Sequence, residues 1–247
     1  MSDKTGLIIT IVLEMVLMFV VEMSGPYGLF RVINHYFDEI CENHIFIEES
    51  MYPQLKTLHS NFNVIEKECN MLLNSLNVIP DAQHIDPSLS KVVSNHDLKF
   101  YMLMILGHHI QPNIERCKQT YAFVSNIEER INVYVLLLEP KKSIKPHASV
   151  FKGLFRYVLP TNVCEGDNCY IQCDDSKKLF KKKNGILYDA RNIHTIVNDT
   201  TKYLVMLVID LVRPLEGFAK GINRLTLSLA SKHEMIEHAI HHATIDA

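Results

Sequence analysis

Hydrophobic and polar positions follow different patterns before and after residue 80. Before it, apolar residues recur at helical spacing, as in Phe62, Ile65 and Cys69, with Asn61 or Asn63 placed to cap a helix. After it, short apolar runs are bounded by Pro, Gly, Asn or Asp, which is typical of strands. The expected strands are Phe100–Leu106, Val133–Leu138, Gly153–Leu159, Cys169–Cys173, Gly185–Tyr188 and Tyr203–Leu211.

Two further segments carry helical spacing. The first, Ile114–Ile127, lies between the first two expected strands, and the second, Ile222–Ala243, follows the last one. Because the strands from residue 133 onward follow one another without helices, we expect an antiparallel barrel or sandwich. The fold class is therefore α+β, with helices before and after the strands.

The segment from Gly6 to Met23 is almost wholly apolar and ends before Gly25 and Pro26, which predict a break. At about 1.5 Å per residue it is long enough to cross most of a bilayer, so we interpret it as a membrane anchor. Glu14 lies near its centre, where a carboxylate costs about 2.5–3.5 kcal/mol on insertion scales. The alternative is a helix packed on the domain.

The charge balance excludes one class of partner. The 247 residues include 25 Lys and Arg against 28 Asp and Glu, for a net charge of −3, so neutralisation of many phosphates, and hence nucleic-acid binding, is not expected. A local basic run, from Lys177 to Lys183, is interpreted as a solvated hairpin loop. Six cysteines are too few for a disulfide scaffold in a chain of this length.

Two histidines, His147 and His194, stand at the ends of segments in the strand-rich half. Side chains projecting inward from strand ends converge in an antiparallel barrel, and neutral imidazole is a good ligand for Fe(II), Zn(II) or Cu(II). The pattern alone also fits structural histidines, because the chain contains 13 of them.

Four motifs occur in the order found in the aspartyl/asparaginyl β-hydroxylase family, which includes bacterial lipid A hydroxylases, and the chain resembles that family. The motifs are Leu138-Glu139-Pro140 through Pro146-His147, Gly153-Leu154-Phe155-Arg156-Tyr157, Gly185-Ile186-Leu187-Tyr188-Asp189 through His194, and Val208-Ile209-Asp210 to Pro214.

The resemblance implies an Fe(II)- and 2-oxoglutarate-dependent dioxygenase on a double-stranded β-helix, a jelly-roll, cupin-like core. The expected organisation is a membrane anchor at 1–24, a helical entry segment at 25–95, the dioxygenase domain at 96–215 and a C-terminal helix at 216–247.

The resemblance also assigns site residues. It implies that His147 and His194 bind iron and that Arg156 helps to hold 2-oxoglutarate, whose carboxylate suits a guanidinium. Ser149 stands where many such oxygenases have a ligating carboxylate, which favours a two-histidine site with water or substrate in the vacant position. Asp189 is assigned a turn-organising role.

Two positions depart from the family pattern. Val158 replaces a histidine, and Leu204 stands where the family has an arginine for the distal carboxylate of 2-oxoglutarate. Because strand side chains alternate with period two, Lys202 is expected on the side of Leu204 and is the predicted substitute for that arginine.

The expected activity is hydroxylation of an unactivated carbon, with O2 and 2-oxoglutarate as co-substrates. The β-carbon of peptidyl Asp or Asn is the first expectation for the substrate, and the expected partners are a protein or peptide substrate and a membrane. Hydroxylation of a lipid acyl chain, as in the lipid A enzymes, is the enzymatic alternative, favoured by the anchor and the basic run but opposed by Ser149, because the lipid A hydroxylases resemble the pattern with an aspartate at that position. A binding module that has lost turnover is the non-enzymatic alternative, favoured by Val158 and Leu204.

Overall fold

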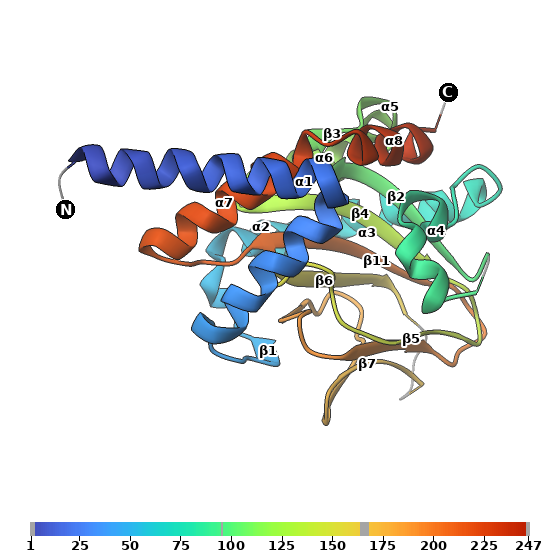
Figure 1. The fold of residues 1–247 in the computed structure, drawn as a ribbon. Helices are drawn as coiled ribbons and strands as arrows, with labels where there is room; N and C mark the ends of the chain where they lie inside the picture. Colours follow the sequence, from blue (N-terminus) through green and yellow to red (C-terminus); the bar gives the residue numbers. More distant parts are fainter. Residues whose placement is uncertain (1–2, 95, 164–167, 246–247) are drawn as a thin grey trace.

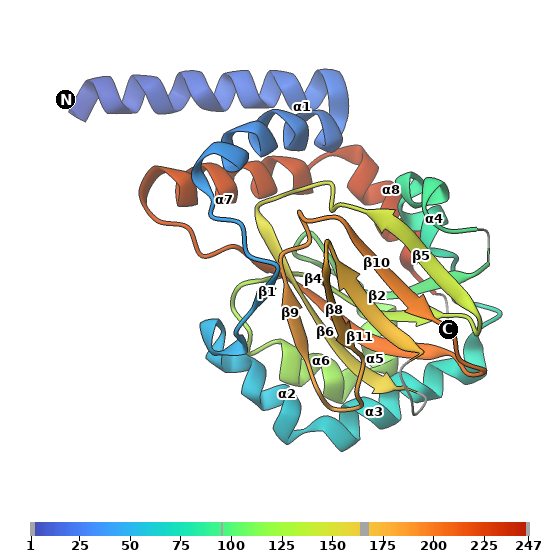
Figure 2. The same cartoon turned by 90° about the horizontal axis from the view of Figure 1, so that it is seen from below.

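The computed structural model describes residues 3–94, 96–163 and 168–245, with side chains described from residue 12 onward in the first helix. Within these residues the strands form two antiparallel sheets that face each other (Figures 1 and 2). The larger sheet contains, in spatial order, β1 (Phe46–Ile47), β9 (Ile186–Tyr188), β6 (Leu154–Asn162), β11 (Leu204–Val212), β4 (Arg130–Leu138), β2 (Leu98–Ile105) and β3 (His108–His109). The smaller sheet contains β5 (Lys142–His147), β10 (His194–Asn198), β7 (Cys169–Cys173) and β8 (Ser176–Leu179). This arrangement confirms the α+β class and the jelly-roll, double-stranded β-helix core.

The central strand β11 is apolar at almost every position because both faces of the larger sheet are covered. Leu204, Met206 and Val208 pack into the core between the two sheets. Val205 and Leu207 point the other way, into a second core formed with the helices. The space between the sheets is where the polar groups described below are found.

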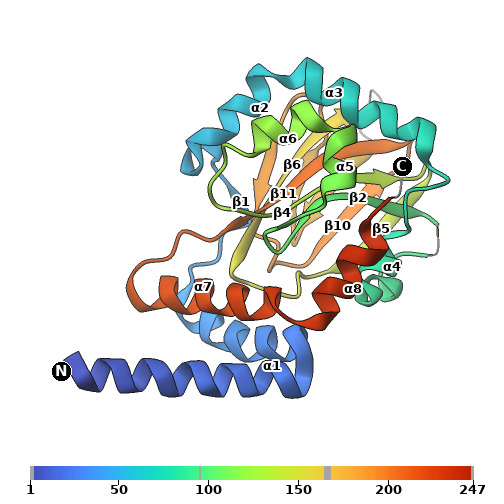
Figure 3. The ribbon, with the colours of Figure 1, turned by 90° about the horizontal axis from the view of Figure 1, so that it is seen from above.

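The outer face of the larger sheet is covered by helices (Figure 3). They are α2 (Lys56–Ser60), α3 (Phe62–Met71), α5 (Gln111–Arg116) and α6 (Lys118–Val124), with 3-10 turns at Glu49–Met51, Pro53–Leu55 and Leu72–Ser75. Asn61 precedes α3 as predicted, but its side chain donates to the Thr57 carbonyl at 2.8 Å and makes no cap for α3. The helix expected over Ile114–Ile127 is two short helices, since Cys117 leaves the helical conformation (φ −124°, ψ 42°).

The C-terminal segment lies on another side of the molecule together with α1 (Figure 3). The single helix expected over Ile222–Ala243 is instead α7 (Gly217–Ser231) followed by α8 (Glu234–Ala243). The break has a local cause: His233 is extended, and its ring Nδ1 accepts a hydrogen bond from the Met235 amide at 3.1 Å, which caps α8. Beside α8 lie α4 (Ala82–Ile85) and a 3-10 turn at Pro87–Lys91.

The first helix, α1 (Asp3–Ile40), is sharply bent at Gly25 (φ 65°, ψ −175°). Proline disfavours a helical residue before it, and glycine accepts the positive φ, so Gly25 and Pro26 produce the predicted break. The first half of α1 projects beyond the domain, and the second half returns along it (Figures 1 and 2). Among the described residues α1 is the one helix long and apolar enough to span a membrane, judged over Val12–Ile40.

In the smaller sheet, β7 has the predicted bounds Cys169–Cys173, whereas β5, β8 and β10 were not among the expected strands. In β5 only Ile144 is buried, so the apolar run that marks a strand is missing. The basic run is also only partly a loop, because Lys177 and Lys178 lie in β8, which pairs with β7. A strand that buries only one face has polar residues at every second position. Such a sequence is hard to distinguish from that of a loop.

Candidate metal centre

His147 and His194 lie side by side on neighbouring strands of the smaller sheet. His147 ends β5 and His194 begins β10, and the two residues are direct partners in the antiparallel register. Their ring centroids are 4.4 Å apart. His194 is only 1% exposed, whereas His147 is half-buried, so the pair has one buried and one more open member.

Each ring is held by a backbone carbonyl. His147 Nδ1 lies 2.8 Å from the Lys145 oxygen, and His194 Nδ1 lies 3.0 Å from the Asn192 oxygen. A carbonyl only accepts hydrogen bonds, so both Nδ1 atoms carry the proton and both Nε2 atoms keep their lone pair. This is the arrangement by which proteins orient histidine ligands of a metal ion.

The surroundings also keep both rings uncharged. Burial lowers the pKa of His147, and burial together with the neighbouring His147 lowers the pKa of His194 to about 3. A metal ion binds the neutral imidazole, so no proton has to be displaced near neutral pH. The donor set therefore fits a divalent metal.

Arg156 faces the histidine pair from the larger sheet, but it is not a free cation. Its Nε and Nη2 donate to the two carboxylate oxygens of Asp210 at 2.6 and 3.1 Å, across the β6–β11 register. Although burial opposes its charge, Asp210 raises the pKa of Arg156 well above the usual value. Asp210 uses two of the five N–H donors of the guanidinium, which leaves the others for a further acceptor.

Two cavities meet at Arg156. A small one, of about 30 Å³, is lined by both histidines together with Arg156, Val158 and Tyr188. A larger one, of about 280 Å³, shares Arg156, Phe100 and Tyr134 with it. The two cavities are therefore adjacent, and the histidine pair lies in the smaller one.

Tyr188 adds a polar group to the small cavity. Its ring meets His194 edge to face at 5.2 Å between centroids, and the side chain is fully buried. Burial raises the pKa of its hydroxyl above the usual range, and the nearby Arg156 guanidinium lowers it in part, although no group among the described residues makes a hydrogen bond of good geometry with it. A buried hydroxyl needs a hydrogen-bond partner, so Tyr188, beside Arg156, is a candidate contact for a polar ligand.

Ser149 lies beside the pair but in the larger cavity, with Arg156 and Asp210. It follows the end of β5, where its amide donates to the Ala190 carbonyl at 2.7 Å. Within residues 3–94, 96–163 and 168–245, no group of three or more His, Cys, Asp or Glu side chains is arranged to hold a metal ion. The protein groups present are thus two histidines without a carboxylate.

Lys202 is not brought to the histidine pair. It is exposed in the turn between β10 and β11, and its carbonyl accepts from Asn198 at the end of β10 away from His194. Because the strand begins only at Leu204, the period-two alternation does not reach Lys202, and neither cavity is lined by it. Lys152, another cation near the site, is paired with Asp38 at 2.5 Å.

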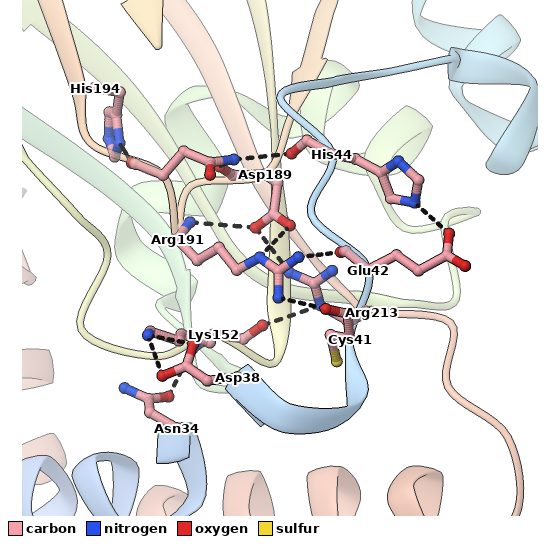
Figure 4. A network of polar contacts seen from close by, with 11 residues as sticks. Asn34, Asp38, Cys41, Glu42, His44, Lys152, Asp189, Arg191, His194 and Arg213 are labelled. Carbon is pink, nitrogen blue, oxygen red and sulfur yellow. Dashed lines mark hydrogen bonds and ion pairs between the residues drawn. The ribbon is translucent and has the colours of Figure 1, made fainter. Parts of the chain in front are cut away.

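Asp189 organises the turn that precedes His194 (Figure 4). It is fully buried and forms ion pairs with Arg191 at 2.9 Å and Arg213 at 2.7 Å. Its amide donates to Ile45, and Asn192 donates to His44, so this turn is tied to the segment after α1. The network fixes the Asn192 carbonyl that orients the ring of His194.

Sequence reasoning assigned no role to Asp210 and Tyr188. Asp210 is the single charge in an otherwise apolar strand, and Arg156 is the single charge in its neighbour β6. Buried charges are tolerated only when they are paired, so these two residues in adjacent apolar strands were a usable signal for a buried ion pair. Tyr188 carried no such signal, because tyrosine is common in strands.

Known structures resemble the chain at low identity. A viral collagen prolyl hydroxylase from Paramecium Bursaria Chlorella virus-1, solved with 2-oxoglutarate, matches with a TM-score of 0.35 and 16% identity, over 60% of this chain and 91% of that one. A cupin domain from Schizosaccharomyces pombe matches with a TM-score of 0.34 and 13% identity, over 51% and 72% of the two chains.

One curated relative is the ornithine lipid ester-linked acyl 2-hydroxylase of Rhizobium tropici, which is 24% identical over 184 residues. The alignment covers 74% of this chain and 66% of the relative, so about a third of the relative has no counterpart here. The profile described as aspartyl/asparaginyl beta-hydroxylase matches residues 59–214, which is more than half of the chain and includes both histidines. The chain therefore belongs to the aspartyl/asparaginyl β-hydroxylase family.

Proposed function

We propose that the protein is an iron(II)-dependent hydroxylase that uses 2-oxoglutarate and O2. The observation that carries this proposal is the pair of neutral histidines, each with its Nδ1 turned to a backbone carbonyl, opposite an arginine and a buried tyrosine hydroxyl. Iron(II), when bound, would couple two uses of O2: one oxygen atom is consumed as 2-oxoglutarate is decarboxylated to succinate and CO2, and the other is inserted into a substrate C–H bond. Membership of the family supports the same chemistry.

The residues of the chain have distinct tasks in this proposal. His147 and His194 hold the metal, while the carbonyls of Lys145 and Asn192 fix their rings. The remaining donors of Arg156 and the hydroxyl of Tyr188 bind a carboxylate of 2-oxoglutarate. Asp210 fixes the guanidinium plane, so the arginine is positioned before the co-substrate arrives.

The larger cavity favours an acyl chain over a peptidyl Asp or Asn as the substrate. Most of its lining side chains are apolar, and its arginine is already paired with Asp210. An aspartyl side chain entering it would lose its hydration and would compete with 2-oxoglutarate for the donors that Asp210 leaves on Arg156, whereas a hydrocarbon chain would leave water at no such cost. The named activity of the Rhizobium relative, on an acyl chain, agrees with this choice.

Succinate formation tests both parts of the proposal. The full chain in detergent, supplied with Fe(II), 2-oxoglutarate and O2, should release succinate in proportion to a hydroxylated acyl lipid and not with Asp- or Asn-containing peptides. Stimulation by the peptides alone would restore the peptidyl substrate. If no lipid or peptide supports succinate release by metal-loaded, folded protein, the hydroxylase proposal fails in favour of a binding module.

A titration with 2-oxoglutarate distinguishes Arg156 from Lys202 as the residue that binds a carboxylate of the co-substrate. Arg156→Lys keeps a charge but loses the planar fork, so we expect the concentration of 2-oxoglutarate for half-maximal turnover to rise about ten- to a hundredfold. Lys202→Ala should give the same titration curve as the natural chain, because Lys202 is exposed at the other end of β10. The measurement is initial succinate rate against 2-oxoglutarate; a rise for Lys202→Ala alone would move the anchor to the β10–β11 turn.

A further inference from the structure

The second half of α1 forms part of the wall of the larger cavity. Pro26, Tyr27 and Phe30 line it from α1, and Phe30 is buried and stacked on Phe151 at 4.6 Å between ring centroids. Across the cavity lie side chains of α8 and β2, among them Ala239 and Met102. The segment that follows the apolar half of α1 is thus structurally part of the site.

The cavity lining is mostly apolar, has a polar end, and also includes Asp86, Ser149 and His238. Its buried members include Met102, Ile105, Leu106, Phe151, Leu154 and Leu227. At the polar end are Asn132, Arg156 and Asp210, and Arg156 also borders the small cavity of the histidine pair. This distribution of apolar and polar lining residues suits a hydrocarbon chain that presents one of its carbons to the histidine pair.

The exposed members of the lining mark where the cavity opens. Tyr27, Val150 and Met235 are 37%, 43% and 40% exposed, and each belongs to a different segment. Pro87 and His238, which also line the cavity, are exposed as well. Met235 also packs on the bend of α1, where a Cβ built on Gly25 would lie 3.1 Å from its sulfur atom. The opening is therefore at the point where the apolar half of α1 joins the domain.

The half of α1 before the bend exposes an apolar surface next to this opening. Its exposed apolar side chains are Val12, Met15, Val16, Met18, Phe19 and Met23, and Leu17 and Val21 are buried against the rest of the protein. Glu14, Glu22 and Ser24 are exposed on the same half of the helix. A helix that is apolar on its buried side and on its solvent side as well is typical of contact with lipid. With that surface in a bilayer, the opening beside Gly25 lies at the bilayer surface.

We propose that the cavity takes the acyl chain of a membrane lipid directly from the bilayer through the opening beside the α1 bend, with Tyr27 and Phe30 as substrate-contacting residues. This inference rests on the proposed function for its catalytic meaning. The helix is then both the membrane anchor and a wall of the substrate site.

The chain contains no tryptophan, so a single introduced one reports on one place. Phe30→Trp puts the reporter in the cavity wall, Phe19→Trp puts it on the exposed apolar face of α1, and Met71→Trp puts it on the exposed surface of α3. Each full-length variant is mixed with phosphatidylcholine vesicles whose acyl chains are dibrominated or unbrominated, without iron or 2-oxoglutarate. Bromine quenches tryptophan fluorescence only on close approach.

We expect quenching for Phe30→Trp and Phe19→Trp, and none for Met71→Trp. Adding Ala239→Phe, which fills the cavity from α8, should remove the quenching of Phe30→Trp and leave that of Phe19→Trp unchanged. Quenching of Phe30→Trp that survives Ala239→Phe would mean that the ring sits in the bilayer, which overturns the proposal. Quenching of Phe19→Trp without quenching of Phe30→Trp would mean that the cavity takes no acyl chain. No quenching of Phe19→Trp would mean that the exposed apolar face of α1 does not contact lipid. Either result would overturn the proposal.

Two further variants replace Phe30→Trp and Ala239→Phe in the test if circular dichroism shows that either of these fails to fold. Tyr27→Trp places the reporter at the half-exposed opening, and Val150→Phe narrows that opening from an exposed position. A parallel titration with free dibromostearic acid separates the sources of the chain: quenching by the free acid but not by vesicles would overturn delivery from the bilayer. Since no turnover is measured, these outcomes do not depend on whether the protein is a hydroxylase.

Discussion

We expect His147→Ala and His194→Ala each to lower iron-dependent succinate formation by more than about a hundredfold while the protein stays folded. In the proposed site the two Nε2 atoms are the ligands that the protein would contribute, and no third His, Cys, Asp or Glu among the described residues is arranged to replace either one. The fold should persist, because the strands β5 and β10 are held by their ladders rather than by the rings. The measurement is succinate release together with far-ultraviolet circular dichroism.

The matched control is His35→Ala, since His35 is an exposed histidine of α1 that lines neither cavity. Its activity and its iron affinity should equal those of the natural chain. Iron affinity measured by equilibrium dialysis should fall for both site variants. Turnover close to the natural level in His147→Ala or His194→Ala would remove that residue from the metal centre.

The parts of the fold that sequence predicted well are those buried on both faces. The runs that became β4, β6 and β11 are apolar because they lie between two cores, and their pattern needs no knowledge of the partner strands. By contrast, β5 buries only Ile144, so its strand character depends on pairing with β10. A pattern of single buried residues does not distinguish such a strand from a loop.

The histidine pair was predicted from the resemblance to the family, because residue type and position alone fit structural histidines equally well. His147 and His194 were expected together, and the antiparallel register does place them opposite each other. The Arg156–Asp210 pair follows from two strands being neighbours, which the sequence does not state. Lys202 does not lie near the pair, because it is in the turn before β11 begins at Leu204, at the end of β10 away from His194.

The buried network around Asp189 should matter for stability as much as the histidines matter for turnover. Arg213→Met keeps most of the side-chain volume but leaves Asp189 with one cationic partner in a fully buried position. Removing one member of a buried ion pair costs about 3–5 kcal/mol, because the remaining charge stays desolvated. For a chain of this size that loss lowers the melting temperature by about 10 °C, measurable by calorimetry.

The matched control for this prediction is Arg224→Met, which removes an arginine from the exposed pair with Glu129 at 3.7 Å. Exposed pairs contribute about 0–1 kcal/mol, so its melting temperature should change by only a few degrees. Arg213→Met should also weaken iron binding about tenfold, because Asp189 fixes the turn whose Asn192 carbonyl orients His194. Equal melting temperatures for the two variants would show that Arg191 alone satisfies Asp189. An unchanged iron affinity in a destabilised Arg213→Met would instead separate the stability of the turn from the orientation of the ring.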